Sequence, residues 1–102
     1  MERYYVGTDL KFALTITSEG FNMDTDPWVA TVRCGKKEVK CERANSVIDE
    51  NGQWYILVDS SVLMAGTYIL IVDIDVPDDD FKDGYRHETL KMEQPLAVVN
   101  LA

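Results

Sequence analysis

Large apolar residues recur with a period of two along much of the chain, and this pattern restricts the fold more than any other feature. Residues 10–16 carry a large apolar side chain at every even position, and similar alternation returns in residues 28–34, 53–58 and 67–76. A period of two is typical of a strand with one buried face. No segment has a helical period, and at most one helical turn is expected in residues 59–66. The sequence therefore predicts an all-β fold.

Turn residues divide this pattern into short strands. Gly35, Gly52 and Gly84 mark tight turns, and Pro95 predicts a bulge or a change of sheet. Because a chain of 102 residues has room for one core, residues 1–102 are interpreted as a single domain. The seven expected strands are residues 4–6, 10–18, 28–34, 38–42, 53–58, 67–76 and 86–99.

Two aromatic residues sharpen the prediction to an immunoglobulin-like (fibronectin-III-like) seven-stranded antiparallel β-sandwich. Tyr68 stands just inside a long strand after Gly66, which is the spacing of a tyrosine corner, where the hydroxyl bonds to the backbone a few residues upstream. Trp28 begins the third strand and is expected to pack between the sheets. The remaining strands are expected in a second sheet apart from those at residues 4–6, 10–18 and 53–58.

Three segments that carry this pattern also form a recognisable set. They are Tyr5-Val6-Gly7-Thr8-Asp9-Leu10-Lys11-Phe12, then Trp28-Val29-Ala30-Thr31-Val32 after an Asp-rich loop, then Ala65-Gly66-Thr67-Tyr68. Together they resemble the amino-terminal β-sandwich of phage baseplate upper proteins and related small phage and prophage tail-associated proteins. The resemblance covers nearly the whole chain, but the acidic run at residues 78–83 does not match. It implies a structural module, without catalytic residues, that docks on neighbouring subunits.

The charge balance restricts the partners. The chain has a net charge of −8, from 18 acidic and 10 basic residues. Such a protein repels nucleic-acid phosphates and anionic lipid surfaces, so neither nucleic acid nor membrane is an expected partner. The chain opens without a basic segment followed by an apolar run. We therefore expect synthesis in the cytoplasm without a signal peptide, and the resemblance implies association with the virion.

Few residues offer chemistry. Cys34 and Cys41 are expected to be free, buried thiols, because no export signal accompanies them. Together with His87 they fall short of a zinc site. No nucleophile motif or phosphate-binding loop accompanies His87, which is interpreted as an ordinary strand residue. The sequence thus predicts neither an enzyme nor a cofactor.

The acidic loop, defined as residues 78–83, contains the weak calcium candidates Asp78, Asp79, Asp80 and Asp83. An EF-hand alignment on Gly84 fails, because Phe81 and Leu90 fall where oxygen ligands are needed. The loop is therefore interpreted as solvated and free of metal, with a less regular calcium site as the alternative. Phe81 is expected to fold back over the core, or else to project as an interface anchor.

Charge is also unevenly distributed along the chain. Residues 33–43 contain five basic and two acidic residues, a balance of +3, whereas residues 73–83 contain six acids and one lysine, a balance of −5. The expected strand order puts these segments at opposite ends of the molecule. Such polarity favours head-to-tail contacts, although plain solubility is the alternative interpretation. The interface candidates are Lys36, Lys37, Lys40, Asp79, Asp80, Phe81, Asp83 and Tyr85.

The predicted function is a non-enzymatic assembly module of a phage or prophage tail or baseplate. Its expected partners are protein subunits, either neighbouring tail proteins or further copies of itself in a homo-oligomer. The alternative is an immunoglobulin-like binding domain of a bacterial protein, of the adhesin or carbohydrate-binding type, because exposed aromatic rings beside carboxylates suit sugars.

Overall fold

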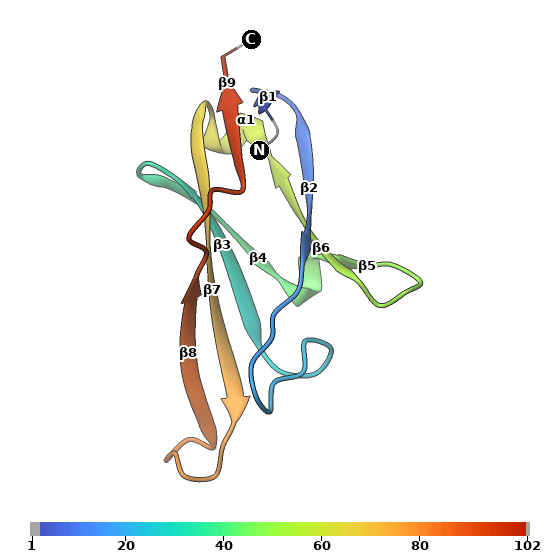
Figure 1. Ribbon diagram of the computed structural model, residues 1–102, viewed down its shortest axis with the longest axis vertical. Coiled ribbons are helices and arrows are strands. Elements are labelled where there is room, and N and C mark those ends of the chain that lie inside the picture. The colour runs from blue at the N-terminus through green and yellow to red at the C-terminus, as the bar shows by residue number, and fades with distance from the viewer. Residues whose placement is uncertain (1–2, 102) are drawn as a thin grey trace.

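The computed structural model describes residues 3–101, and within them almost all regular structure is β (Figure 1). A six-stranded sheet has the order β1-β9-β7-β3-β4, with β8 also paired to β7, and a three-stranded sheet has the order β2-β6-β5. The elements are β1 (Arg3–Tyr5), β2 (Asp9–Leu14), β3 (Trp28–Cys34), β4 (Lys37–Glu42), a 3-10 turn (Arg43–Asn45), β5 (Val47–Ile48), β6 (Trp54–Asp59), α1 (Ser60–Leu63), β7 (Gly66–Pro77), β8 (Tyr85–Lys91) and β9 (Ala97–Asn100).

The long strand β7 organises the larger sheet. It pairs antiparallel with β3 along one edge, and with β9 and then β8 along the other. Asp75 N–H donates to the carbonyl of Pro27 at 3.1 Å, and Asp78 N–H donates to the carbonyl of Gly84 at 2.9 Å. Because ladder bonds alternate, odd-numbered residues of β7 bond toward β3 and even-numbered ones toward β8.

The core lies between the two sheets. All even-numbered residues of β7 from Tyr68 to Val76 are buried, as their alternation predicts. Leu10 and Leu14 of β2 and Ile56 and Val58 of β6 cover them from the smaller sheet. The buried faces expected for residues 28–34 and 53–58 are confirmed, except that Cys34 and Trp54 are only partly buried.

Tyr68 and Trp28 occupy the positions expected of them. Tyr68 is 0% exposed, and its hydroxyl donates to the carbonyl of Met64 at 2.6 Å, so the predicted bond to upstream backbone is confirmed. That carbonyl lies just after the single helical turn α1. Trp28 is 3% exposed, its indole N–H donates to the carbonyl of Met23 at 2.9 Å, and its ring meets Trp54 edge-on at 5.8 Å. Both rings therefore close the core.

The first strand is not where the sequence predicted it. β1 pairs with β9 in the larger sheet, and the pairing is parallel, with Tyr4 opposite Val99. The prediction that residues 4–6 join the strands at residues 10–18 and 53–58 is wrong. Gly7, with φ at +101°, and the bond from Thr8 N–H to the carbonyl of Tyr5 turn the chain between the sheets. The sandwich is thus not wholly antiparallel.

The last predicted strand is divided in two. Continuing the register of β8 would put Gln94 opposite Tyr68, but Tyr68 faces Ala97. The three extra residues form a bulge around Pro95, whose nitrogen has no proton for the ladder. Both halves stay in one sheet, so the bulge is confirmed and the change of sheet is not.

Two further differences change the strand count within residues 3–101 from seven to nine. Besides the division of the last strand, residues 47–48 form β5 against Tyr55 and Trp54. The second strand ends at Leu14 rather than at residue 18, because its partner Trp54 is the first residue of β6 and nothing follows to pair with.

The two cysteines do not face each other. Cys41 lies opposite Ala30 and Cys34 lies opposite Lys37, so their register forbids a disulfide. Cys41 is buried, and desolvation raises the pKa of its thiol. Cys34 is only half-buried, because it lies near the end of β3. The predicted free thiols are confirmed, and the predicted burial holds for Cys41 alone.

Replacing Tyr68 with Phe should lower the free energy of unfolding by about 1–2 kcal/mol, because the buried carbonyl of Met64 loses its donor while the ring is kept. Urea denaturation followed by tryptophan fluorescence measures this loss. Tyr5→Phe, at a ring that is exposed to solvent, is the matched control and should change stability little. Equal stability of the two variants would contradict the role of the Tyr68 hydroxyl.

Candidate functional site

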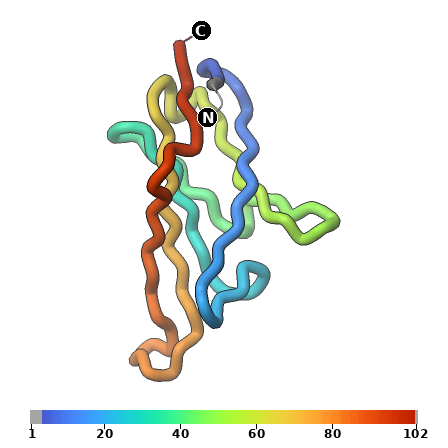
Figure 2. Tube along the Cα trace, in the orientation of Figure 1, coloured from blue at the N-terminus to red at the C-terminus, as the bar shows by residue number. Residues whose placement is uncertain are grey.

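The charged segments lie at opposite ends of β7. β3 and β7 are antiparallel, with Trp28 opposite Ile74 and Arg33 opposite Ile69, so the β3–β4 turn lies beside the first half of β7. The acidic loop follows the far end of β7, and the Cα trace shows the two turns well apart along the molecule (Figure 2). From Ile69 to Pro77 the strand rises roughly 25 Å, more than twice a Debye length at physiological salt. The expected polarity is therefore confirmed.

The acidic loop is a folded turn. Phe81 N–H donates to the carbonyl of Asp78 at 3.2 Å, and Gly84 N–H donates to the carbonyl of Phe81 at 2.9 Å. Asp78 also accepts the N–H of Asp80 on a side-chain oxygen at 3.0 Å. Gly84 has a φ of +84°, which a side chain would resist. The loop thus holds its carboxylates in fixed places.

Arg86 joins this loop to the rest of the hairpin. Its guanidinium donates to Asp78 at 2.7 Å and to Glu88 at 2.9 Å, and it also reaches the carbonyl of Glu19 at 3.2 Å. Glu88 accepts in addition from the hydroxyl of Ser18 at 3.0 Å. These donors, Arg86 first, lower the pKa of Glu88. The network stabilises the hairpin against residues 18–19.

His87 lies between two carboxylates, which sequence reasoning missed. Its Nδ1 contacts Asp75, the cross-strand neighbour on β7, and its Nε2 lies 3.0 Å from Asp83. The hydrogen bonds to Asp75 and then to Asp83 raise the pKa of His87. The backbone N–H of Tyr85 and the His87 ring in turn lower the pKa of Asp83. The signal for this cluster is the β7–β8 register, which the sequence pattern does not fix.

The calcium candidates do not converge on a point. Asp78 is paired with Arg86 and Asp83 with His87, and both also accept backbone N–H groups. Within residues 3–101, no group of three or more His, Cys, Asp or Glu side chains is arranged to hold a metal ion. Asp79 and Asp80 project to solvent. The loop therefore presents negative charge outward.

Two aromatic rings accompany this charge. Phe81 is 47% exposed at the tip of the loop and Tyr85 is 38% exposed at the start of β8. The expectation that Phe81 folds back over the core is wrong, because the tight turn from Asp78 to Gly84 points its side chain away from the sheets. Exposed rings beside carboxylates are suited to contacts with another protein.

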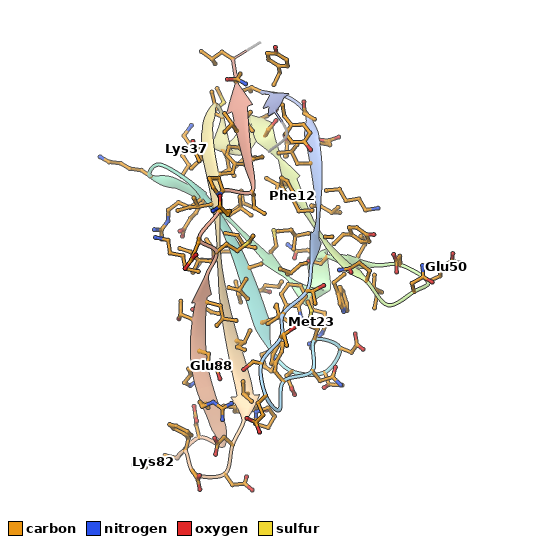
Figure 3. The ribbon with its side chains drawn as sticks, in the orientation of Figure 1. Phe12, Met23, Lys37, Glu50, Lys82 and Glu88 are labelled. Carbon is orange, nitrogen blue, oxygen red and sulfur yellow. The ribbon has the colours of Figure 1, made fainter. Side chains whose placement is uncertain are left out.

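The basic turn, defined as Lys36, Lys37 and Lys40, forms the opposite pole (Figure 3). Gly35, with φ at +60°, begins the turn between β3 and β4. None of the three lysines makes an ion pair with another described residue, whereas Arg33 lies 3.8 Å from Glu38. Their ammonium groups are thus available to a carboxylate-bearing partner.

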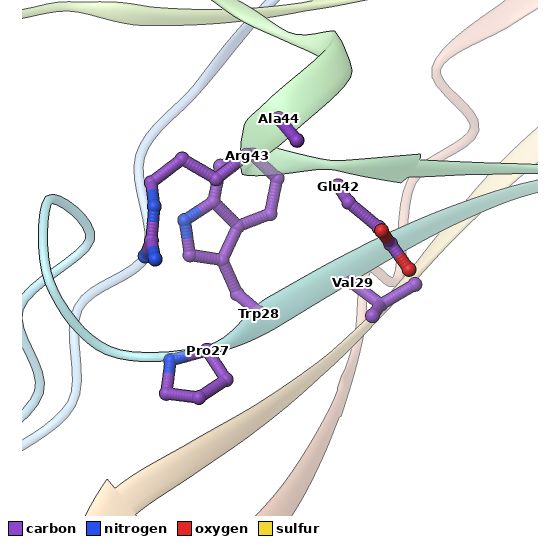
Figure 4. A pocket seen from close by; sticks show the side chains of 6 residues that line it. All are labelled: Pro27, Trp28, Val29, Glu42, Arg43 and Ala44. Atoms are coloured by element: carbon purple, nitrogen blue, oxygen red, sulfur yellow. The ribbon is translucent and has the colours of Figure 1, made fainter.

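A hollow next to Trp28 offers no comparable chemistry. Figure 4 shows its lining, which is Pro27, Trp28, Val29, Glu42, Arg43 and Ala44. The guanidinium of Arg43 is already bonded to the carbonyls of Met23 at 3.3 Å and Asp26 at 2.7 Å, so it secures the loop before β3. The ring of Trp28 is nearly buried. The hollow is therefore a by-product of core packing.

Comparisons with known proteins give no relative. No family model, no curated protein and no solved structure matches the chain. In the described part of the chain, no helix has the length and apolar character needed to cross a bilayer. Functional inference therefore depends on the poles and edges of this molecule.

The pKa of His87 should lie above the value of 6.5 that is typical of histidine, because both ring nitrogens face carboxylates. The cluster's stabilisation is then full below about pH 6.5 and is lost as the pH rises through the raised pKa. An NMR titration of the ring protons measures this value directly.

Asp75→Asn should return the pKa of His87 toward 6.5, since the Asp75 carboxylate is the largest contributor. Asp79→Asn is the matched control, because Asp79 has no contact with the ring. A wild-type pKa at or below 6.5 would contradict the cluster.

Proposed function

We propose that this chain is a non-enzymatic assembly module of immunoglobulin-like type. It docks on neighbouring protein subunits of a phage or prophage tail or baseplate. The observation that carries the proposal is the separation of the acidic loop and the basic turn at opposite ends of one elongated molecule, 50 Å in its longest dimension. Surfaces of opposite charge at two ends complement each other when molecules align head to tail.

The immunoglobulin-like assignment is supported by particular contacts. The bond from the Tyr68 hydroxyl to the carbonyl of Met64 matches a tyrosine corner, and Trp28 lies between the two sheets. The resemblance of the sequence to phage baseplate proteins supports the setting. Both poles lie in loops, where binding residues are usually found because the sheets hold them rigidly.

The acidic loop supplies the recognition surface in this proposal. Phe81 and Tyr85 give it exposed apolar area, and Asp79 and Asp80 give it unpaired charge. Aromatic anchors surrounded by charge bind tightly when the partner offers a complementary basic rim. A basic turn such as that formed by Lys36 and Lys37 meets this requirement.

Carbohydrate binding is the second candidate, favoured by the same exposed rings of Phe81 and Tyr85. Sugar hydroxyls also need carboxylate oxygens that are free to accept. Asp78 and Asp83 beside the rings are engaged by Arg86 and His87. The loop is therefore better suited to a protein partner.

Reversing both Lys36 and Lys37 to Glu should weaken association of the protein at low salt, because the basic turn loses its attraction for the acidic loop. Light scattering over a range of concentrations measures the association. Raising the salt from about 0.05 M to about 0.5 M should have a similar effect on the wild type.

The matched control reverses Lys11 and Lys82 instead, which changes the net charge equally but leaves the basic turn intact. This control should not weaken association. Association that is unchanged by the Lys36 and Lys37 reversal, or absent at every concentration, would remove the head-to-tail arrangement.

A further inference from the structure

One edge of the larger sheet is open. β1 covers the outer edge of β9, but no strand within residues 3–101 pairs with the outer edge of β8. β8 is seven residues long. An open edge of that length exposes a row of backbone donors and acceptors that another strand can bind.

The hydrogen-bond phase fixes which groups face outward. Asp78 N–H bonds to the carbonyl of Gly84, and Met92 N–H bonds to the carbonyl of Leu70, one at each end of the β7–β8 ladder. Since bonded pairs alternate, even-numbered residues of β8 bond to β7. The N–H and C=O groups of the odd-numbered residues, from 85 to 91, therefore point to the open edge.

We propose that this edge pairs with the same edge of a second copy, antiparallel, about a twofold axis at His87. The two large sheets then form one continuous sheet. A twofold contact of this kind is self-complementary and closes at two copies. It is independent of the basic turn, which lies toward the other end of the molecule.

The charges of β8 select the axis. With His87 opposite His87 of the second copy, Arg86 faces Glu88 of that copy, and the symmetry repeats this pair. These are positions without ladder bonds between them, where facing side chains come closest, and opposite charges there are stabilising. Asp83 faces Lys91, also twice. Tyr85 faces Thr89, an aromatic and β-branched pair that suits a sheet.

The neighbouring axes that keep the same hydrogen-bond phase are less favourable. An axis at Glu88 puts the two Glu88 side chains opposite each other, and an axis at Arg86 does the same with two arginines. Facing like charges are destabilising. The alternation of charge along β8 therefore excludes slipped registers and most unrelated strands.

The same register covers exposed apolar surface. It brings the acidic loop of one copy beside residues 91–93 of the other, so that the exposed ring of Phe81 approaches the exposed side chains of Leu90 and Met92. These two line an open groove together with Leu14, Ile16, Leu70 and Val72. Contacts between sulfur and an aromatic ring are favourable.

Cysteine cross-linking tests both the dimer and its register. His87→Cys places two thiols across the axis at a bonded pair, where the Cα atoms are about 5.5 Å apart, within the range of a disulfide. Under mild oxidation this variant should form a covalent dimer, detected on a non-reducing gel. His87 is 65% exposed, so its replacement should not disturb the core.

Glu88→Cys and Lys91→Cys are the matched variants, and the wild-type chain reports any background from Cys34 and Cys41. In the proposed register neither substituted pair is opposite itself, so each should cross-link far less than His87→Cys. No cross-linking by His87→Cys at any concentration, or stronger cross-linking by Glu88→Cys, would overturn the proposal.

A charge reversal separates this contact from the head-to-tail one. Lys91→Glu faces Asp83 of the second copy twice and should weaken the dimer about tenfold in sedimentation equilibrium. Lys40→Glu alters the basic turn by the same charge and should leave this dimer unchanged. Equal weakening by both variants would contradict edge pairing while leaving the head-to-tail contact standing.

Discussion

The backbone hydrogen bonds of β7 hold the rest of the molecule in place. Its odd-numbered residues bond toward β3 and its even-numbered residues toward β8 and β9, so the middle of the strand has partners on both sides. Its inward side chains, from Tyr68 to Val76, are all buried. One strand thus fixes the sheet order, the core and the distance between the two charged ends.

Function follows from that distance. Because β7 is twelve residues long, the acidic loop at its far end and the basic turn near its beginning are too far apart to neutralise each other. Each end is left to attract a partner of opposite charge. The division of the last strand around Pro95 matters as well, since β1 covers only β9 and leaves β8 open along its outer edge.

Local patterns predicted what depends on neighbouring residues. The period of two identified the buried faces of β3, β6 and β7, and the spacing from Gly66 to Tyr68 predicted the bond that the hydroxyl makes. Pairing between distant strands is a matter of register, which composition does not encode. The parallel pairing of β1 with β9, the contact of His87 with Asp75 and the projection of Phe81 all depend on it.

Amide hydrogen exchange, residue by residue, tests the central position of β7 most directly. At low concentration the amides of the middle of β7 should exchange slowest, and in β8 the even-numbered amides should exchange slowly while those of His87 and Thr89 exchange fast. Exchange in β7 as rapid as in the acidic loop, or equal exchange at odd and even positions of β8, would contradict the account.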